Sequence, residues 1–191
     1  MPITGSKSEK GFRVRRANAA DASRLARVGA TLFAQAFAAQ NRPDDMLKYL
    51  AAAFGERQQT SELADKTNLI WIAEDDESHP VGYAYVKLRS EPKSLKVGQA
   101  AELVRIYADQ SWYGRGVGAE LLRTCIDASM KSGAEVLWLG VWKENPRGIA
   151  FYQKNGFRIV GEQTFQLGHD AQHDWIMVRH LDQRAAVSSP L

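Results

Sequence analysis

The chain has 191 residues, of which 45% are hydrophobic and 25% charged, and its formal net charge is +3. This length is typical of one domain, and the single cysteine, Cys125, excludes an intrachain disulfide scaffold. The longest apolar run, Tyr49–Phe54, has six residues, whereas a membrane-spanning helix needs roughly 20, and no block of five like charges marks a nucleic-acid-binding tail.

The first half of the chain is predicted to hold one strand, three helices and a β-hairpin. Phe12–Arg16 alternates between apolar and polar residues, which favours a short strand. Asn18 followed by Asp21 is typical of a helix N-terminus, and apolar residues at helical spacing predict a helix over Ala19–Gln40. The further elements expected here are helices over Pro43–Phe54 and Glu56–Leu63 and hairpin strands over Asn68–Glu74 and Val81–Leu88.

The second half alternates strands with helices. A strand over Ala101–Ala108 precedes a helix over Gly114–Lys131, and the nearly continuous apolar run Val136–Trp142 predicts a buried central strand. The remaining elements are a helix over Pro146–Lys154 and strands over Phe157–Leu167 and Asp174–Leu181. This order predicts a mixed α/β domain built around one sheet.

The turn that leads from Ala108 into the following helix is rich in glycine, at Gly114, Gly116 and Gly118. Glycine lets backbone N–H groups approach an anion closely, and a helix N-terminus adds unsatisfied donors and partial positive charge. The pattern therefore favours a diphosphate ligand. The alternative is a tight strand-to-helix turn that binds nothing.

Two common phosphate-binding motifs match this turn poorly. A P-loop needs Gly-Lys-Ser/Thr after its loop, and the sequence has none. Gly114–Ala119 matches the dinucleotide pattern G-x-G-x-x-G/A, but residues 109–113 separate it from its strand. The acid that would bind the ribose, Glu135, falls at the start of the next strand rather than at its end.

Two segments together resemble the GNAT acetyltransferases. Tyr113-Gly-Arg-Gly-Val-Gly118 resembles the family's coenzyme A loop, Q/R-x-x-G-x-G/A, with Tyr113 where Gln or Arg is usual. About 30 residues later, Asn145–Phe157 resembles the second signature, N-x-x-A-x-x-F-Y-x-K-x-G-F, with Gly148 at the small-residue position. The resemblance extends over roughly Phe12–Leu181.

The resemblance implies a mixed, mostly antiparallel central sheet with splayed middle strands and helices on both faces. It also implies acetyl-CoA as cosubstrate, with the pantetheine arm lying along a strand and the diphosphate on the glycine turn. The cofactor contacts that it assigns are Ile106, Tyr107 and Ala108; Gly114, Arg115, Gly116, Val117, Gly118 and Ala119; Asn145 and Lys154.

Acetyl transfer to an amine also needs a base and an acid. An aliphatic ammonium has a pKa of about 10.4, so it must lose a proton before it attacks. The resemblance assigns the base to Glu102, although a water relay or a merely solvated Glu102 are alternatives. It places the Tyr152 hydroxyl beside the thioester sulfur, where a hydrogen bond would stabilise developing charge; the alternative is a tyrosine that only packs on the sheet.

A narrower resemblance points to the acceptor. Asn41–Leu50, Trp138–Trp142 and Asp174–Met177 resemble bacterial polyamine acetyltransferases of the Pai type, which acetylate spermidine or spermine. Val104 replaces an acid of that pattern, which argues against a strongly cationic acceptor. We expect an N-acetyltransferase that acts on a small primary amine by direct attack in a ternary complex. The alternatives are a peptide, protein N-terminus or toxin amine as acceptor, or a non-catalytic coenzyme A-binding module.

Other features of the sequence are expected to be structural. His169 and His173 lie four apart with acids beside them, but a predicted loop would not bring them together, so we expect no metal. Cys125 lies among apolar helix residues and is predicted to be buried. We expect one domain over 11–182 between flexible ends at 1–10 and 183–191, a cytoplasmic location, no nucleic-acid or membrane partner, and compatibility with a homodimer.

Overall fold

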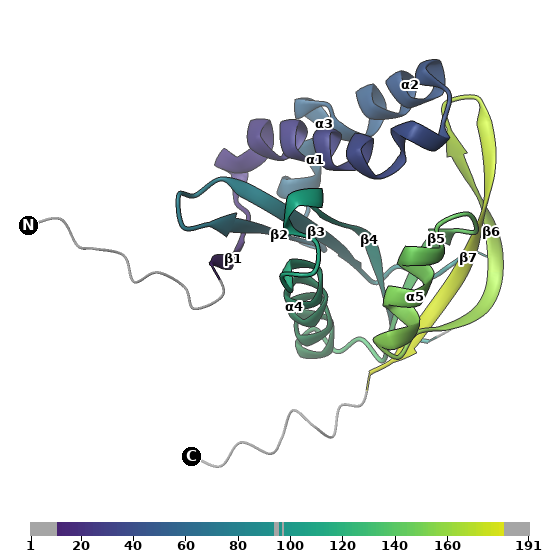
Figure 1. Cartoon of the computed structure of the whole chain (residues 1–191). Coiled ribbons are helices and arrows are strands. Elements are labelled where there is room, and N and C mark those ends of the chain that lie inside the picture. The colour runs from purple at the N-terminus through teal and green to yellow at the C-terminus, as the bar shows by residue number, and fades with distance from the viewer. Residues whose placement is uncertain (1–10, 94–95, 97, 182–191) are drawn as a thin grey trace, which may run out of the picture.

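The computed structural model describes residues 11–93, 96 and 98–181, so the predicted flexible ends lie outside the described residues. Seven strands form one sheet in the order β1-β2-β3-β4-β5-β7-β6, with helices on both faces (Figure 1). All neighbouring strands are antiparallel except β4 and β5. The strands are β1 (Phe12–Arg16), β2 (Asn68–Asp75), β3 (Pro80–Leu88), β4 (Ala100–Ala108), β5 (Val136–Trp142), β6 (Arg158–Leu167) and β7 (Asp170–His180). The predicted mixed, mostly antiparallel sheet is therefore confirmed.

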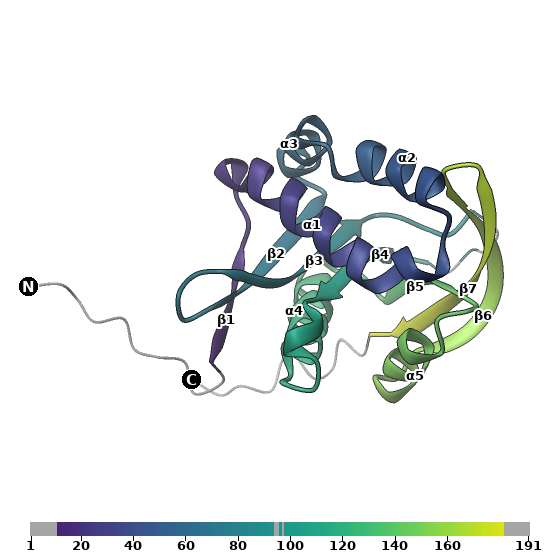
Figure 2. The ribbon, with the colours of Figure 1, turned by 45° about the horizontal axis from the view of Figure 1, so that its top comes forward.

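The sheet separates two layers of core, and helices cover each of its faces (Figure 2). One face of the sheet, called the α1 face here, is covered by α1 (Ala22–Phe37), α2 (Pro43–Phe54) and α3 (Glu56–Ala64). The other, the α4 face, carries α4 (Val117–Lys131) and α5 (Pro146–Lys154). Alternate residues of β3 point to opposite faces, so the side chains that they bury differ: Tyr83 and Tyr85 on the α1 face, Ala84 and Val86 on the α4 face.

Several predicted boundaries were right and a few were wrong. The predicted cap at Asn18 is confirmed, because its side chain accepts a hydrogen bond from Ala20 and the Asp21 side chain bonds back to the Asn18 amide. The helix predicted from Gly114 begins instead at Val117, since Gly114 and Gly116 adopt left-handed φ values of 77° and 88° that no right-handed helix contains.

The last hairpin is longer than the sequence indicates. The strand predicted from Asp174 begins at Asp170, so only Gly168 and His169 remain as the turn. The additional residues are mostly exposed and polar, which is why they show no apolar alternation. On α2, the apolar residue Leu47 is 66% exposed, whereas Met46 beside it is buried.

A buried ion pair joins α3 to the sheet on the α1 face. Arg105 donates to the Glu62 carboxylate at 2.8 Å, and the two side chains are 9% and 7% exposed. The guanidinium also lies over the Phe54 ring, 4.9 Å from its centroid. Within the described ranges, no helix has the length and apolar character needed to cross a bilayer.

The feature of the sheet that matters most is the divergence of its two parallel strands. The pairing between β4 and β5 comprises only Ala100 with Val136, Ala101 with Leu137, and Glu102 with Trp138. Beyond it, β4 pairs with β3 alone, and a bulge leaves Val104 as an extra residue opposite Tyr85 and Val86. The edge of β4 beyond Glu102 therefore faces a gap instead of a partner strand.

Candidate functional site

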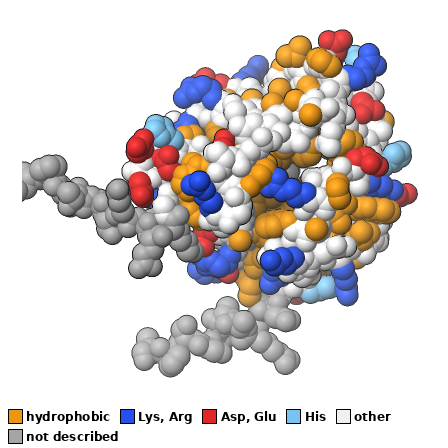
Figure 3. Space-filling view, viewed as in Figure 1, with side chains coloured by type: hydrophobic (Ala, Val, Ile, Leu, Met, Phe, Trp, Pro, Cys, Tyr) orange, Lys and Arg blue, Asp and Glu red, His pale blue; other side chains and the backbone are white. Residues whose placement is uncertain are grey.

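The gap between β4 and β5 can receive an extended ligand. Ile106, Tyr107 and Ala108 lie past the last β4–β5 pair and are half-buried. Backbone groups along the edge that β5 leaves unpaired can bond an extended chain, as strand addition does in peptide binding. Figure 3 shows this side of the molecule hollowed between the surfaces of α4 and α5, with hydrophobic side chains inside the hollow and Lys and Arg side chains at its rim.

The glycine turn lies at the open end of this gap. A 3-10 turn over Gln110–Trp112 leads from β4 into it, held by the Asp109 side chain, which accepts from the Ser111 amide at 2.9 Å. Gly116 is the N-cap of α4, and no side chain caps that helix. A Cβ on Gly114 or Gly116 would meet nothing within 4 Å, so there is open space beside the turn that precedes α4. Free helix N-terminal amides beside open space suit an anionic group.

α5 forms the opposite wall. The Asn145 side chain accepts from the Gly148 amide at 2.9 Å, so it caps this helix. Phe151 comes within 3.8 Å of the Cβ position of Gly118, which brings α5 against the start of α4. Lys154, the last residue of α5, is exposed. The two matched segments of the sequence therefore meet at one place in the fold.

Tyr152 lies between the rings of Phe151 and Phe157, with centroids 5.4 and 5.7 Å away. Burial raises the pKa of Tyr152, and the nearby Cys125 thiol adds to that shift. A phenol in this setting stays protonated at neutral pH and can donate a hydrogen bond. Burial likewise raises the pKa of Tyr107 on β4.

Tyr113, which stands where the resembled pattern has Gln or Arg, contacts Arg147 of α5. Arg147, at the start of α5, lies over the Tyr113 ring at 3.3 Å from its centroid, so this contact connects the glycine turn to α5. Arg115 lies over Trp112 at 5.2 Å. Sequence reasoning missed Arg147, because nothing in local spacing indicates a contact with a ring 34 positions earlier.

Glu102 lies at the closed end of the gap. Its backbone belongs to the last β4–β5 pair, and its carboxylate accepts from the Ser90 hydroxyl at 2.7 Å. The indole of Trp138 donates to the Ser90 carbonyl at 2.7 Å, which holds this corner together. Glu102 is half-buried, so it is not simply a solvated acid at the start of a strand.

Aromatic side chains line the α1 side of the gap. Tyr107 packs against Phe33 and Phe37 at 5.8 and 6.3 Å between centroids, and Phe37 lies 6.4 Å from Trp142. The outer strands reach the same helices, since the His169 amide donates to the Asp45 carboxylate of α2 at 2.7 Å. The turn between β6 and β7 is therefore attached to the helices of the α1 face.

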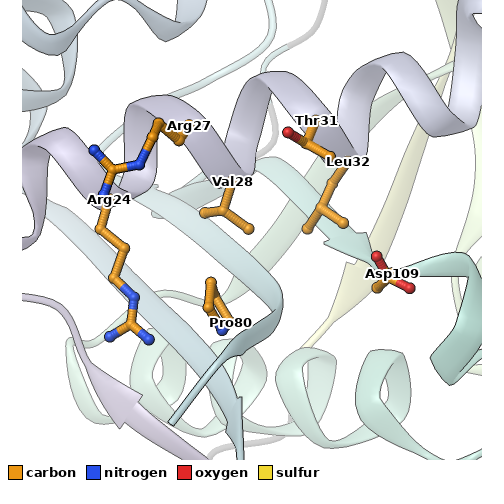
Figure 4. Close-up of a pocket in the computed structure, with 7 residues that line it drawn as sticks. All are labelled: Arg24, Arg27, Val28, Thr31, Leu32, Pro80 and Asp109. Carbon is orange, nitrogen blue, oxygen red and sulfur yellow. The ribbon is translucent and has the colours of Figure 1, made fainter.

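Features elsewhere in the structure are separate from the gap. A hollow of about 310 Å³ between α1 and the start of β3 has seven lining residues, labelled in Figure 4: Arg24, Arg27, Val28, Thr31, Leu32, Pro80 and Asp109. Arg24 is bound there to buried Glu74 at 2.6 Å. Cys125 is buried as predicted, and burial raises the pKa of its thiol, which opposes reactivity. In the part of the chain that the structure describes, no three His, Cys, Asp or Glu side chains gather as a metal site would require.

Comparison with known proteins gives matches along most of the chain. The model of the acetyltransferase (GNAT) family matches residues 33–157. An uncharacterised N-acetyltransferase of Mycobacterium tuberculosis is 32% identical over 161 residues, which are 84% of this chain and 98% of that protein. An uncharacterised N-acetyltransferase of Lactobacillus delbrueckii subsp. lactis is 29% identical over 149 residues, 78% of this chain and 86% of its own.

Solved structures share the same fold. PaiA N-acetyltransferase of Thermoplasma acidophilum, in complex with coenzyme A, superposes with a TM-score of 0.73 at 20% identity, covering 88% of this chain and 98% of that one. A GCN5-related N-acetyltransferase of Rhodopseudomonas palustris gives a TM-score of 0.70 at 20% identity, covering 95% and 100%.

Proposed function

Since this chain belongs to the GNAT family of acetyltransferases, we propose that it transfers an acetyl group from acetyl-CoA to the primary amine of a small molecule. The observation that carries this proposal is the end of β4–β5 pairing at Glu102 and Trp138, beside a glycine turn with left-handed Gly114 and Gly116. A pantetheine arm bonds the free edge of β4, and the diphosphate bonds the first amides of α4.

Each residue of the site has a proposed role. The amides of Gly114–Ala119 bind the diphosphate, and an amide within Ile106–Ala108 donates to the thioester oxygen, where negative charge develops. Tyr152 donates to the sulfur as the C–S bond breaks. Glu102, held by Ser90, is the candidate base on β4. Asn145 shapes the wall by capping α5, and Lys154 meets the nucleotide.

The narrower proposal for the acceptor is a polyamine. It rests on the resemblance of Asn41–Leu50, Trp138–Trp142 and Asp174–Met177 to the Pai-type enzymes. A spermidine N-acetyltransferase chimera is among the structures of similar fold, with a TM-score of 0.65 at 17% identity, which is a reason to include spermidine in an assay. A cytoplasmic location, the absence of a metal and a homodimeric state stay predictions.

The test is release of free coenzyme A from acetyl-CoA in the presence of single acceptors. The set comprises spermidine, spermine, butylamine, a peptide with a free N-terminus, and butanol as a neutral control. We expect turnover with small amines and none with butanol. Turnover with the peptide alone would show that the acceptor is a peptide or protein N-terminus and not a small amine. Tight coenzyme A binding without any acetyl transfer would indicate a non-catalytic module.

Replacing Arg147 by alanine should raise the Kd for coenzyme A about 5–10-fold. The guanidinium now lies over Tyr113, beside the amides that bind the diphosphate, so its removal takes away both a cation and the contact between the turn and α5. Isothermal titration calorimetry at low and high salt measures the effect, which should shrink at high salt. Arg158→Ala, on β6, is the control for loss of a positive charge; equal losses in both variants would contradict a specific role.

A further inference from the structure

One buried carboxylate near the gap has no partner. Asp174, on β7, is 6% exposed, and its Oδ1 atom is fully enclosed without a hydrogen-bond partner. Buried polar atoms are almost always bonded, since leaving one unpaired costs stability. Burial alone raises the pKa of Asp174 to about 6, with no nearby cation to oppose it. A buried carboxylate without a hydrogen-bond partner can bind a cationic ligand that enters from solvent.

The position of Asp174 connects it to the gap. Its backbone pairs with Trp142 of β5 on one side and with Gln163 of β6 on the other. A Cβ on Gly140 would lie 2.5 Å from Gln163 Nε2 and 3.1 Å from Asp174 Oδ2, so both side chains lie over the only glycine of β5. Gly140 is exposed although Leu139 and Val141 beside it are buried. Solvent therefore reaches β5 at the point over which Asp174 lies.

Asp174 also shares its face of the sheet with the aromatic residues of the gap. Residues alternate along β7, and Ile176, two positions on, packs against Trp138. Gln172, two positions back, bonds to Asn41 before α2, which identifies this as the α1 face. A hollow of about 270 Å³ opens at the same end of β5, and Trp142 and Gln172 are among the residues that line it.

The hollow beside Asp174 is also lined by Lys143, whose ammonium group is bound to Glu162 and lies over the Trp175 ring, and by His173. From α2 comes the Tyr49 phenol, whose pKa is raised by burial and, to a smaller extent, by the charges of Glu62 and Asp174, while the Arg105 guanidinium lowers it. β5 presents Gly140 and Trp142, and β6 presents Gln163, none of which titrates. Tyr49 also stacks near Phe165 at 5.3 Å between centroids. A carboxylate beside aromatic rings is a combination that recognises an ammonium group.

From this arrangement we propose that Asp174 receives the ammonium group of the acceptor amine and takes one of its protons, a proposal that rests on the function proposed above. Of the three ammonium protons, one passes to Asp174 and frees the nitrogen lone pair. The nitrogen then forms the C–N bond, and the C–S bond breaks. The second proton reaches the sulfur through Tyr152, and the third stays on the amide. Asp174 returns its proton to solvent when the products leave.

Steady-state kinetics of Asp174→Asn with a small amine tests the role. We expect kcat/KM for the amine to fall about 100-fold or more, with the Kd for coenzyme A within about twofold, because removing one partner of a buried charge pair has a large effect. The wild-type kcat/KM should decline below pH about 6, where Asp174 becomes protonated, and the variant should lack that decline.

Two further variants give the comparison. Glu162→Gln removes the same charge from the neighbouring strand, where the carboxylate is 63% exposed and bound to Lys143; it should stay within about twofold of wild type. Glu102→Gln tests the candidate base named above, which Asp174 replaces in this proposal, so we expect a smaller loss of kcat/KM than for Asp174→Asn. If Asp174→Asn lies within about threefold of wild type, the proposal is overturned.

The binding of the amine to Asp174 can also be measured by NMR, without any turnover. With ¹³C-labelled aspartate, the carboxyl signal missing in Asp174→Asn identifies Asp174 in the coenzyme A-bound protein. Butylamine or spermidine should lower the pKa that this signal reports, and butanol should not. No response to any amine overturns the proposal. A response without acetyl transfer supports the role of Asp174 and overturns the proposed function instead.

Discussion

Replacing Tyr152 by phenylalanine should lower kcat about 100-fold, with the Kd for coenzyme A within about twofold of wild type. The reason is that the phenol is buried beside Phe151 and Phe157 and stays protonated, and that in the proposed mechanism it serves only the breaking C–S bond. A proton donor aimed at developing charge typically contributes 10²–10⁴-fold. The measurements are steady-state kinetics with acetyl-CoA and an accepted amine, and calorimetry with coenzyme A.

The control for this variant is Tyr83→Phe. Tyr83 is 1% exposed on the α1 face, and its hydroxyl has no hydrogen-bond partner. Removing this hydroxyl should leave kcat within about twofold of the wild-type value, because a buried unpaired hydroxyl contributes neither to stability nor to the reaction. Equal kcat values for the two variants would remove Tyr152 from the mechanism and leave it as a packing residue.

Replacing Glu62 by glutamine should lower the free energy of unfolding by about 3–5 kcal/mol. The substitution leaves the Arg105 guanidinium buried without a counter-charge, and breaking a buried pair from one side has this cost. Arg105 keeps a long hydrogen bond of 3.3 Å to the Ala53 carbonyl and its position over the Phe54 ring, and the introduced amide oxygen can still accept, but none of these groups carries a negative charge. Urea denaturation, followed by tryptophan fluorescence, gives the change in the midpoint.

Asp127→Asn is the matched control for this prediction. Asp127 pairs with Arg123 on α4 at 2.9 Å, but the two side chains are 46% and 62% exposed. A solvated pair of this kind contributes at most about 0.5 kcal/mol. If the two substitutions shift the urea midpoint equally, the buried Glu62–Arg105 pair stabilises the fold no more than an exposed pair does, and the prediction is wrong.

Local pattern was enough to predict most of the elements. The run Val136–Trp142 and the helix Pro146–Lys154 match β5 and α5 at both ends, since continuous apolar character and an Asn-Pro start act locally. The start of α4 was wrong because the same glycines that suggest a ligand also postpone the helix. The start of β7 was wrong because its first residues are exposed.

What the sequence could not predict depends on contacts between distant residues. The divergence after Glu102 is a matter of register between β4 and β5, and no residue of either strand marks it alone. Arg147 reaches Tyr113 only because α5 packs against the start of α4. Asp174 reads as one polar residue of an edge hairpin until Gly140 is seen beneath its carboxylate. The sequence thus indicated the family and the glycine turn, and the structure added Arg147 and Asp174 to the candidate site.

The most direct test of the account is a coenzyme A titration followed by the backbone amide NMR signals of the ¹⁵N-labelled protein. We expect the signals of Gly114–Ala119 and Ile106–Ala108 to shift together with one Kd, while those of the β2–β3 turn stay in place. Coenzyme A that leaves both stretches unshifted, or that does not bind, would contradict the account.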